Sequence, residues 1–202
     1  MNSSPRREPS ARWNHNIHYH RVVLDAVPDS AGTALDVGTG DGLLATELRE
    51  KGYTVTAIDT DGPVLERARR LSGDVDWVLG DAMTYQFGRT FDVVASIATL
   101  HHLPDLPAAC ARLAALTAPG GVLVIVGLAR SSRPADLAFD AWGALQHRRL
   151  SSRHGYWEHT APTAWPAHTY AQVRRCAVEH FPGARWRRLP LFRYALVWRR
   201  PH

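Results

Sequence analysis

Three glycines at alternating positions, Gly38, Gly40 and Gly42, are the residues whose type and spacing point most directly to chemistry. They follow an apolar run and lead into an amphipathic helical pattern. Glycine adopts backbone angles that a Cβ forbids, so the chain can turn tightly there and let a ligand lie against amides at a helix N-terminus. The segment is typical of a loop that binds a nucleotide cofactor, although glycine runs of this kind also occur by chance.

Carboxylates follow three of the predicted strands, and each suits a different part of such a ligand. Asp59 ends the second strand, where it can accept hydrogen bonds from both ribose hydroxyls of NAD or of S-adenosylmethionine. Asp36 ends the first strand, where it can meet the methionine end of S-adenosylmethionine, directly or through water. Asp81 follows the third, near the expected adenine amine. Asp36 and Asp81 favour S-adenosylmethionine over NAD. The length of the chain does so too, because it is too short for a dinucleotide domain plus a substrate domain.

The ordered motifs resemble those of class I S-adenosylmethionine-dependent methyltransferases, especially small single-domain members similar to ubiquinone and menaquinone methyltransferases. The resemblance covers roughly residues 13–200. It rests on Asp-Val-Gly-Thr-Gly-Asp-Gly (36–42), Ala-Ile-Asp (57–59), Gly-Asp-Ala (80–82), Phe-Asp-Val-Val-Ala-Ser (91–96), Leu-His-His-Leu (100–103) and Leu-Thr-Ala-Pro-Gly-Gly (116–121). It implies methyl transfer from S-adenosylmethionine to a small-molecule acceptor, with S-adenosylhomocysteine as product, and secondary metabolism as a setting. The implied cofactor contacts are Asp36, Gly38, Thr39, Gly40, Asp59, Thr60, Asp81, Ala82, Met83 and Ile97.

The hydrophobic pattern alternates strands with helices, which predicts an α/β fold. Strands are expected at 33–37, 53–58, 75–79, 91–96, 121–127, 184–189 and 191–199, and helices at 14–27, 41–51, 62–71, 105–117, 134–150 and 167–181. The last two strand patterns are separated only by Pro190-Leu191, too short for a crossover helix, so they must pair antiparallel. With the family resemblance, this predicts a doubly wound, Rossmann-like sheet of seven mostly parallel strands with one antiparallel terminal strand.

One domain is expected over residues 13–202, with an amino-terminal cap helix, a substrate-covering insertion at about 130–166 and a disordered tail at 1–12. Residues 13–20 place three histidines and two amides beside two aromatic rings. His18 and Tyr19 are predicted to contact the cofactor, because small class I methyltransferases commonly close over it with an amino-terminal helix. Plain helix packing is the alternative. A metal site is not expected, since His15 and His18 have helical ligand spacing but no nearby acid.

Residues after the fourth strand and within the insertion are the candidates for the acceptor site. His101 is a candidate base, because a histidine pKa near 6.5 allows proton transfer at neutral pH. His159 is a second candidate base. His-His pairs also recur in the family as a structural segment, so a purely structural role for this pair stays open. The predicted substrate contacts are His102, Tyr156, Trp157, Glu158 and Trp165, whose rings suit a partly apolar acceptor, although they can also simply shield the sheet edge.

The chemistry itself asks little of side chains, because methyl transfer needs an acceptor lone pair aligned with an already activated methyl group. Two alternatives remain at this stage. One is a protein that binds S-adenosylmethionine without methylating, for instance a cyclase. The other is a nicotinamide-dependent reductase, which the Gly-Asp-Ala motif at 80–82 and the antiparallel terminal strand disfavour.

Composition narrows the setting. The chain has 202 residues, 45% of them hydrophobic, with no apolar run near the roughly 20 residues of a membrane span and no signal-like amino end. We therefore expect a cytoplasmic monomer or homodimer. Cys110 and Cys176 lack metal-ligand spacing and are expected to be reduced. A nucleic-acid substrate is not expected, since the net charge of +5 comes largely from arginine usage and no base-methylating signature follows the fourth strand.

Overall fold

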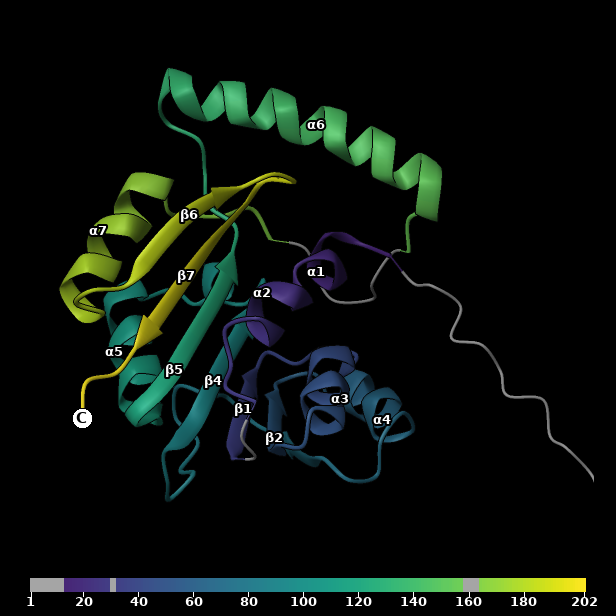
Figure 1. The fold of residues 1–202 in the computed structure, drawn as a ribbon, viewed down its shortest axis with the longest axis vertical. Helices are drawn as coiled ribbons and strands as arrows, with labels where there is room; N and C mark the ends of the chain where they lie inside the picture. The colour runs from purple at the N-terminus through teal and green to yellow at the C-terminus, as the bar shows by residue number, and fades with distance from the viewer. Residues whose placement is uncertain (1–12, 30–31, 158–163) are drawn as a thin grey trace, which may run out of the picture.

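The structure, a computed structural model, describes residues 13–29, 32–157 and 164–202. Seven strands form one sheet in the order β3-β2-β1-β4-β5-β7-β6 (Figure 1). Six run parallel, and β7 is antiparallel to both of its neighbours, β5 and β6. The strands are β1 (Thr33–Val37), β2 (Thr54–Asp59), β3 (Asp76–Leu79), β4 (Phe91–Ile97), β5 (Thr117–Gly127), β6 (Arg185–Leu189) and β7 (Arg193–Arg199). The predicted Rossmann-like sheet with one antiparallel strand is confirmed.

Helices cover both faces of this sheet because alternate residues of each strand point to opposite sides. In β1, Leu35 and Val37 pack into the cluster beneath α5 and α7, while Ala34 packs toward α2 and α3. The helices are α1 (His15–His18), α2 (His20–Leu24), α3 (Leu43–Glu50), α4 (Gly62–Arg69), η1 (Leu100–His102), α5 (Leu106–Leu116), α6 (Pro134–His154) and α7 (Tyr170–His180). Among the helices in the described ranges, none combines the length and apolarity needed to cross a membrane.

The amino-terminal helix expected over 14–27 is instead two short helices joined at Tyr19. Asn14 begins α1 by accepting hydrogen bonds at its side-chain oxygen from the amides of Asn16 and Ile17. Tyr19 then leaves the helical conformation, its ring is buried, and its hydroxyl donates to the carbonyl of Pro190. Tertiary packing against the β6–β7 turn therefore overrides the helical pattern of the sequence.

Helix α6 lies outside the two helical layers, across the end of the sheet toward which β5 points (Figure 1). Gly143 is its only buried residue, and Leu137 and Leu145 are about two-thirds exposed. The helix runs four residues beyond the predicted end at 150 and stops at Gly155, which has a positive φ of 69°. The predicted tail at 1–12 and part of the predicted insertion, residues 158–163, lie outside the described residues.

Candidate active site

A cleft of about 1480 Å³ lies along the carboxyl ends of the parallel strands. Ligands of open α/β sheets bind in this position, because the loops that leave neighbouring strands diverge there. The walls are formed by the loops after β1, β2 and β4, by residues 128–131 after β5, and by the amino-terminal segment. Most of the residues selected from the sequence therefore meet in one place.

The glycine loop has a tight turn at one end and an open surface at the other. Gly38 has a φ of +71°, its amide donates to the carbonyl of Ile58 at 2.9 Å, and an added Cβ would lie 2.1 Å from the hydroxyl oxygen of Thr99. Gly40 has a φ of +54°, and an added Cβ would meet nothing within 4 Å. The first glycine therefore permits close packing, and the second leaves backbone accessible to a ligand in the cleft.

Asp59 ties the glycine loop to the end of β2. One carboxylate oxygen accepts from the amide of Gly40 at 2.8 Å, and the other accepts from the amide of Asp61 at 3.0 Å. Each carboxylate oxygen has two acceptor positions. One position on each oxygen is therefore available for the two ribose hydroxyls that the sequence assigned to this residue.

Asp36 is buried beside the cleft, with the hydroxyl of Thr39 donating to it at 2.7 Å. Burial raises the pKa of Asp36 to about 6, against the opposing effects of this hydrogen bond and of His20. His20 also lines the cleft, and its Nδ1 lies 3.0 Å from a carboxylate oxygen of Glu47. A cationic ligand group next to Asp36 would favour its charged form.

Thr60, Asp81, Ala82 and Ile97 also line the cleft, as predicted for cofactor contacts. Asp81 is exposed, and one of its carboxylate oxygens accepts from the amide of Met83 at 2.9 Å. Met83 itself does not line the cleft, in contrast to its predicted contact. Its side chain packs against the core, because the turn that Asp81 holds directs it back toward the sheet.

The amino-terminal segment reaches the cleft through residues other than the two predicted. Asn14, His15, Asn16, Ile17 and His20 line it. His18 is exposed and Tyr19 is buried against the β6–β7 turn, so neither faces the cofactor pocket. The break between α1 and α2 explains the difference, since it rotates the face that an uninterrupted helix would present. The described residues contain no group of three or more histidine, cysteine or acidic side chains that can hold a metal ion.

His101 and His102 both line the cleft after β4, with ring centroids 4.1 Å apart. Burial, together with the nearby His102 and Arg193, lowers the pKa of His101 to about 4, well below the ordinary value assumed from the sequence. Its Nδ1 is buried without a hydrogen-bond partner among the described residues. His102 is more exposed, and burial lowers its pKa too. His101 is thus neutral at physiological pH, but a weaker base than an ordinary histidine.

Aromatic rings form the outer part of the cleft. Tyr156 and Trp157 line it, and the ring of Tyr156 lies 5.8 Å from that of His15. The amide of Trp157 donates to the carbonyl of Trp13 at 2.8 Å, which joins the chain after α6 to the amino-terminal segment. Trp165 is at the rim with 96% of its surface exposed. The candidates Glu158 and His159 lie outside the described residues.

Three residues of this wall were missed from the sequence, namely Tyr170, Phe192 and Arg193. Tyr170 begins α7, Arg193 begins β7, and Phe192 directly precedes β7. The signal in the sequence is an arginine that opens an apolar strand, and this pattern is equally typical of a strand with one solvent-facing side. Antiparallel β7 enters the sheet where β5 leaves it, with Tyr194 opposite Gly127. This pairing carries the start of β7 into the cleft.

Comparisons with known proteins show the family of the chain. Residues 35–125 match the family model described as a methyltransferase domain. An uncharacterized methyltransferase of Mycobacterium tuberculosis is 40% identical over 195 residues, covering 94% of this chain and 98% of the relative. A ubiquinone biosynthesis O-methyltransferase of Xanthomonas oryzae is 37% identical over 161 residues, covering 71% and 66%.

Among solved structures, the N-methyltransferase NodS of Bradyrhizobium japonicum in complex with S-adenosylhomocysteine is similar in fold. Its TM-score is 0.61 at 19% identity, and the match covers 92% of this chain and 87% of that one.

The fold and the cleft define a Rossmann-like enzyme of the methyltransferase class. The chain belongs to the class I S-adenosylmethionine-dependent methyltransferases, with relatives among the ubiquinone methyltransferases. Its cofactor is S-adenosylmethionine. The chain therefore does not belong to the nicotinamide-dependent reductases, the alternative considered from the sequence.

Proposed function

We propose that this enzyme transfers the methyl group of S-adenosylmethionine to a small-molecule acceptor bound between the amino-terminal segment and the chain that follows α6. The observation that carries the proposal is one continuous cleft from the glycine loop to the aromatic rim. Pockets for a single small ligand typically measure about 300–1,000 Å³. At about 1480 Å³, this cleft has room for a cofactor and an acceptor side by side.

The residues present fit the cofactor at each of its parts. Asp59 has acceptor positions for the ribose hydroxyls, and Gly40 leaves the surface of the loop free of side chain. Asp81 keeps one carboxylate oxygen for the adenine amine, and Asp36 offers a buried acid for the cationic methionine end. The bound cofactor supplies an activated methyl group, so the task of the protein is to align the acceptor and exclude water.

His101 is our candidate for accepting a proton from the acceptor. It lies at the end of β4 beside the aromatic part of the cleft, and its low pKa keeps it neutral at physiological pH. Its buried Nδ1 has no partner among the described residues. A base is needed when the acceptor is a hydroxyl or a protonated amine. The relatives named as ubiquinone biosynthesis O-methyltransferases support a hydroxyl acceptor.

Calorimetric titration with S-adenosylhomocysteine tests the cofactor site. Replacing Asp59 with alanine removes two charge-assisted hydrogen bonds to ribose, so we expect affinity to fall by about 1.5–3 kcal/mol. Asp74→Ala is the matched control, because Asp74 is an exposed acid away from the cleft. If wild type and Asp59→Ala bind S-adenosylhomocysteine with equal affinity, Asp59 does not bind the ribose. A screen of acceptors by product mass then separates methylation from a rearrangement such as a cyclisation.

A pH profile tests the role of His101. Its pKa of about 4 predicts a rate that is flat from pH 6 to pH 8, where an ordinary histidine base would lose activity on the acid side. His101→Gln should lower kcat by roughly 10²–10⁴-fold for a hydroxyl acceptor. An unchanged kcat in this variant would show that His101 only packs.

A further inference from the structure

Arg193, the first residue of β7, is a buried cation in the wall of the cleft. Only 6% of its surface is exposed. One terminal nitrogen donates to the side-chain oxygen of Asn16 at 2.9 Å, and the other donates to the carbonyl of Leu191 at 3.4 Å. Its Nε is buried with no partner among the described residues. Both hydrogen-bond acceptors of its guanidinium among the described residues are therefore neutral.

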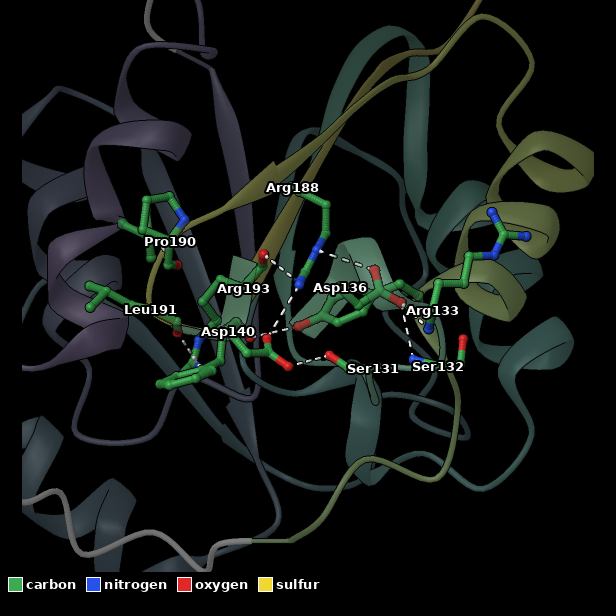
Figure 2. A network of polar contacts seen from close by, with 12 residues as sticks. Ser131, Ser132, Arg133, Asp136, Asp140, Arg188, Pro190, Leu191 and Arg193 are labelled. Carbon is green, nitrogen blue, oxygen red and sulfur yellow. Dashed lines mark hydrogen bonds and ion pairs between the residues drawn. The ribbon is translucent and has the colours of Figure 1, made fainter. Parts of the chain in front are cut away.

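The neighbouring Arg188 shows how this fold treats an arginine with a structural role. Arg188 donates to a carboxylate oxygen of Asp140 at 3.4 Å and lies 4.0 Å from that of Asp136 (Figure 2). Its guanidinium also covers the ring of Tyr170 at 3.3 Å. Arg193 forms no ion pair with any carboxylate in the part of the chain that the structure describes. Of these two arginines on adjacent strands, Arg188 has carboxylate partners, and Arg193 has none among the described residues.

A buried guanidinium without a counter-charge is costly, because it has lost its hydration and gained no opposite charge in exchange. Burial lowers the pKa of Arg193 to about 10, which still leaves it charged at neutral pH. Its charge also contributes to the low pKa of His101. A cation held in this way beside the candidate base indicates that its counter-charge arrives with a ligand.

We propose that Arg193 binds an anionic group of the methyl acceptor, so that the acceptor is an organic anion such as a carboxylate. This inference rests on the proposed methyl transfer and deepens it by naming the acceptor class. A planar guanidinium with unused N–H donors suits a carboxylate, which it can bind through two parallel hydrogen bonds. The rings of Phe192, Tyr156 and Trp157 line the same part of the cleft and suit an apolar body attached to that anion.

The methionine carboxylate of the cofactor is the other anion that enters this cleft, and the sheet order argues against it. The glycine loop follows β1, and β7 is three strand positions away in the order β1-β4-β5-β7. Neighbouring strands lie about 4.8 Å apart, so the two sites are separated by roughly 14 Å along the sheet. Arg193 therefore lies on the acceptor side, past the end of β5.

The test is calorimetric binding to the protein saturated with S-adenosylhomocysteine. The probes are benzoate, phenylacetate and butyrate, each compared with its neutral amide. We expect at least one acid to bind the wild type at least tenfold more tightly than its amide. Arg193→Gln should abolish that preference, and Arg193→Lys should retain part of it because the charge remains. Arg187→Gln, at an exposed position of the adjacent strand β6, should behave as wild type.

The outcomes separate this inference from the proposal on which it rests. Failure of the wild type to bind S-adenosylhomocysteine overturns the cofactor site and with it the proposed function. Normal cofactor binding with no acid preferred over its amide, or with a preference that survives in Arg193→Gln, overturns the anion site alone. A tenfold loss of S-adenosylhomocysteine affinity in Arg193→Gln would assign Arg193 to the methionine carboxylate instead.

Thermal unfolding of the same variants distinguishes a ligand site from a structural one. Because the unpaired buried charge disfavours the folded state, Arg193→Gln should keep or raise Tm while losing acid preference. A lower Tm with the acid preference intact would show that Arg193 serves packing only.

Discussion

Gly38 shows how one missing Cβ positions the cofactor loop. Alanine there must adopt a positive φ and would also place its Cβ 2.1 Å from the hydroxyl oxygen of Thr99. We expect Gly38→Ala to lower the free energy of unfolding by about 2 kcal/mol or more, measured by denaturant titration. Gly183→Ala is the control, because it has a φ of +80° but nothing within 4 Å, and should cost only about 1 kcal/mol. Equal losses would mean that the contact with Thr99 relaxes freely.

Asp36 makes stability depend on pH in a direction opposite to that of most carboxylates. Its pKa rises from 3.8 to about 6 on folding, so between these values the folded state binds more protons than the unfolded state. Its contribution to stability is therefore full below pH 3.8 and is lost as pH rises through 6. Relative to wild type, Asp36→Asn should gain roughly 2 kcal/mol between pH 4.5 and pH 7, and urea titrations at those two pH values check this. A pH-independent difference would contradict the raised pKa.

The residues most accessible to sequence reasoning are those whose role is set by the backbone beside them. The glycine loop and Asp59 adjoin the strands that place them, so a local pattern was enough to bring them to the cleft. His18, Tyr19 and Arg193 depend on contacts between distant parts of the chain. The hydrogen bond from Tyr19 to Pro190 spans 171 positions, and no local pattern encodes it. Arg193 was missed for the same reason.

At the scale of elements, α6 is attached by polar contacts at its start and by contacts of His147 and His154 with Trp13 nearer its end. Asp136 accepts from the amides of Ser132 and Arg133, and Asp140 accepts from the hydroxyl of Ser131 at 2.5 Å (Figure 2). Arg188 joins both acids to β6. Since the helix buries only Gly143, this polar network holds the start of α6 in place, whereas α5 and α7 are held by their buried apolar faces.

Arg188→Ala should therefore loosen α6 without unfolding the sheet. We expect a loss of about 2 kcal/mol of local stability, seen as roughly thirtyfold faster amide hydrogen exchange at the start of α6. Arg185→Ala, at an exposed position of the same strand, should leave that exchange unchanged. If both variants exchange alike, α6 is held by something other than Arg188.

Element types were predictable because the hydrophobic period differs between strands and helices. All seven strands lie within four residues of their expected starts, and the longest shift, at β5, has a tertiary cause. Residues 117–120 extend β5 because Thr117 pairs with Phe91 and Gly121 accepts from the amide of Arg200. The seven-stranded sheet came from the family resemblance and the antiparallel pairing of the last two strands from the short Pro190-Leu191 turn, not from the period itself.

At the scale of the whole molecule, the two halves of the sheet have different tasks. The half formed by β1 to β4 carries the glycine loop and its acids, while β5, β7 and the amino-terminal segment line the part of the cleft where we propose that the acceptor binds. Both halves share continuous apolar layers, since β4 and β5 pair along their length and β7 closes onto β5. If the whole domain unfolds as one unit, a ligand bound to the first half also stabilises the second half. If the second half opens on its own, the ligand does not stabilise it.

The reactivity of the two cysteines reports whether α5 and α7 open together with the cofactor site or separately from it. Cys110 on α5 and Cys176 on α7 are buried facing one another, and burial raises the pKa of both thiols, so neither should react with a thiol reagent in the native protein. Saturation with S-adenosylhomocysteine at 100 times its Kd should slow labelling of both about hundredfold, because unfolding must first release the ligand. Mass spectrometry of labelled peptides follows each thiol separately. A labelling rate that is the same with and without S-adenosylhomocysteine would show that α5 and α7 open locally, independent of the cofactor site.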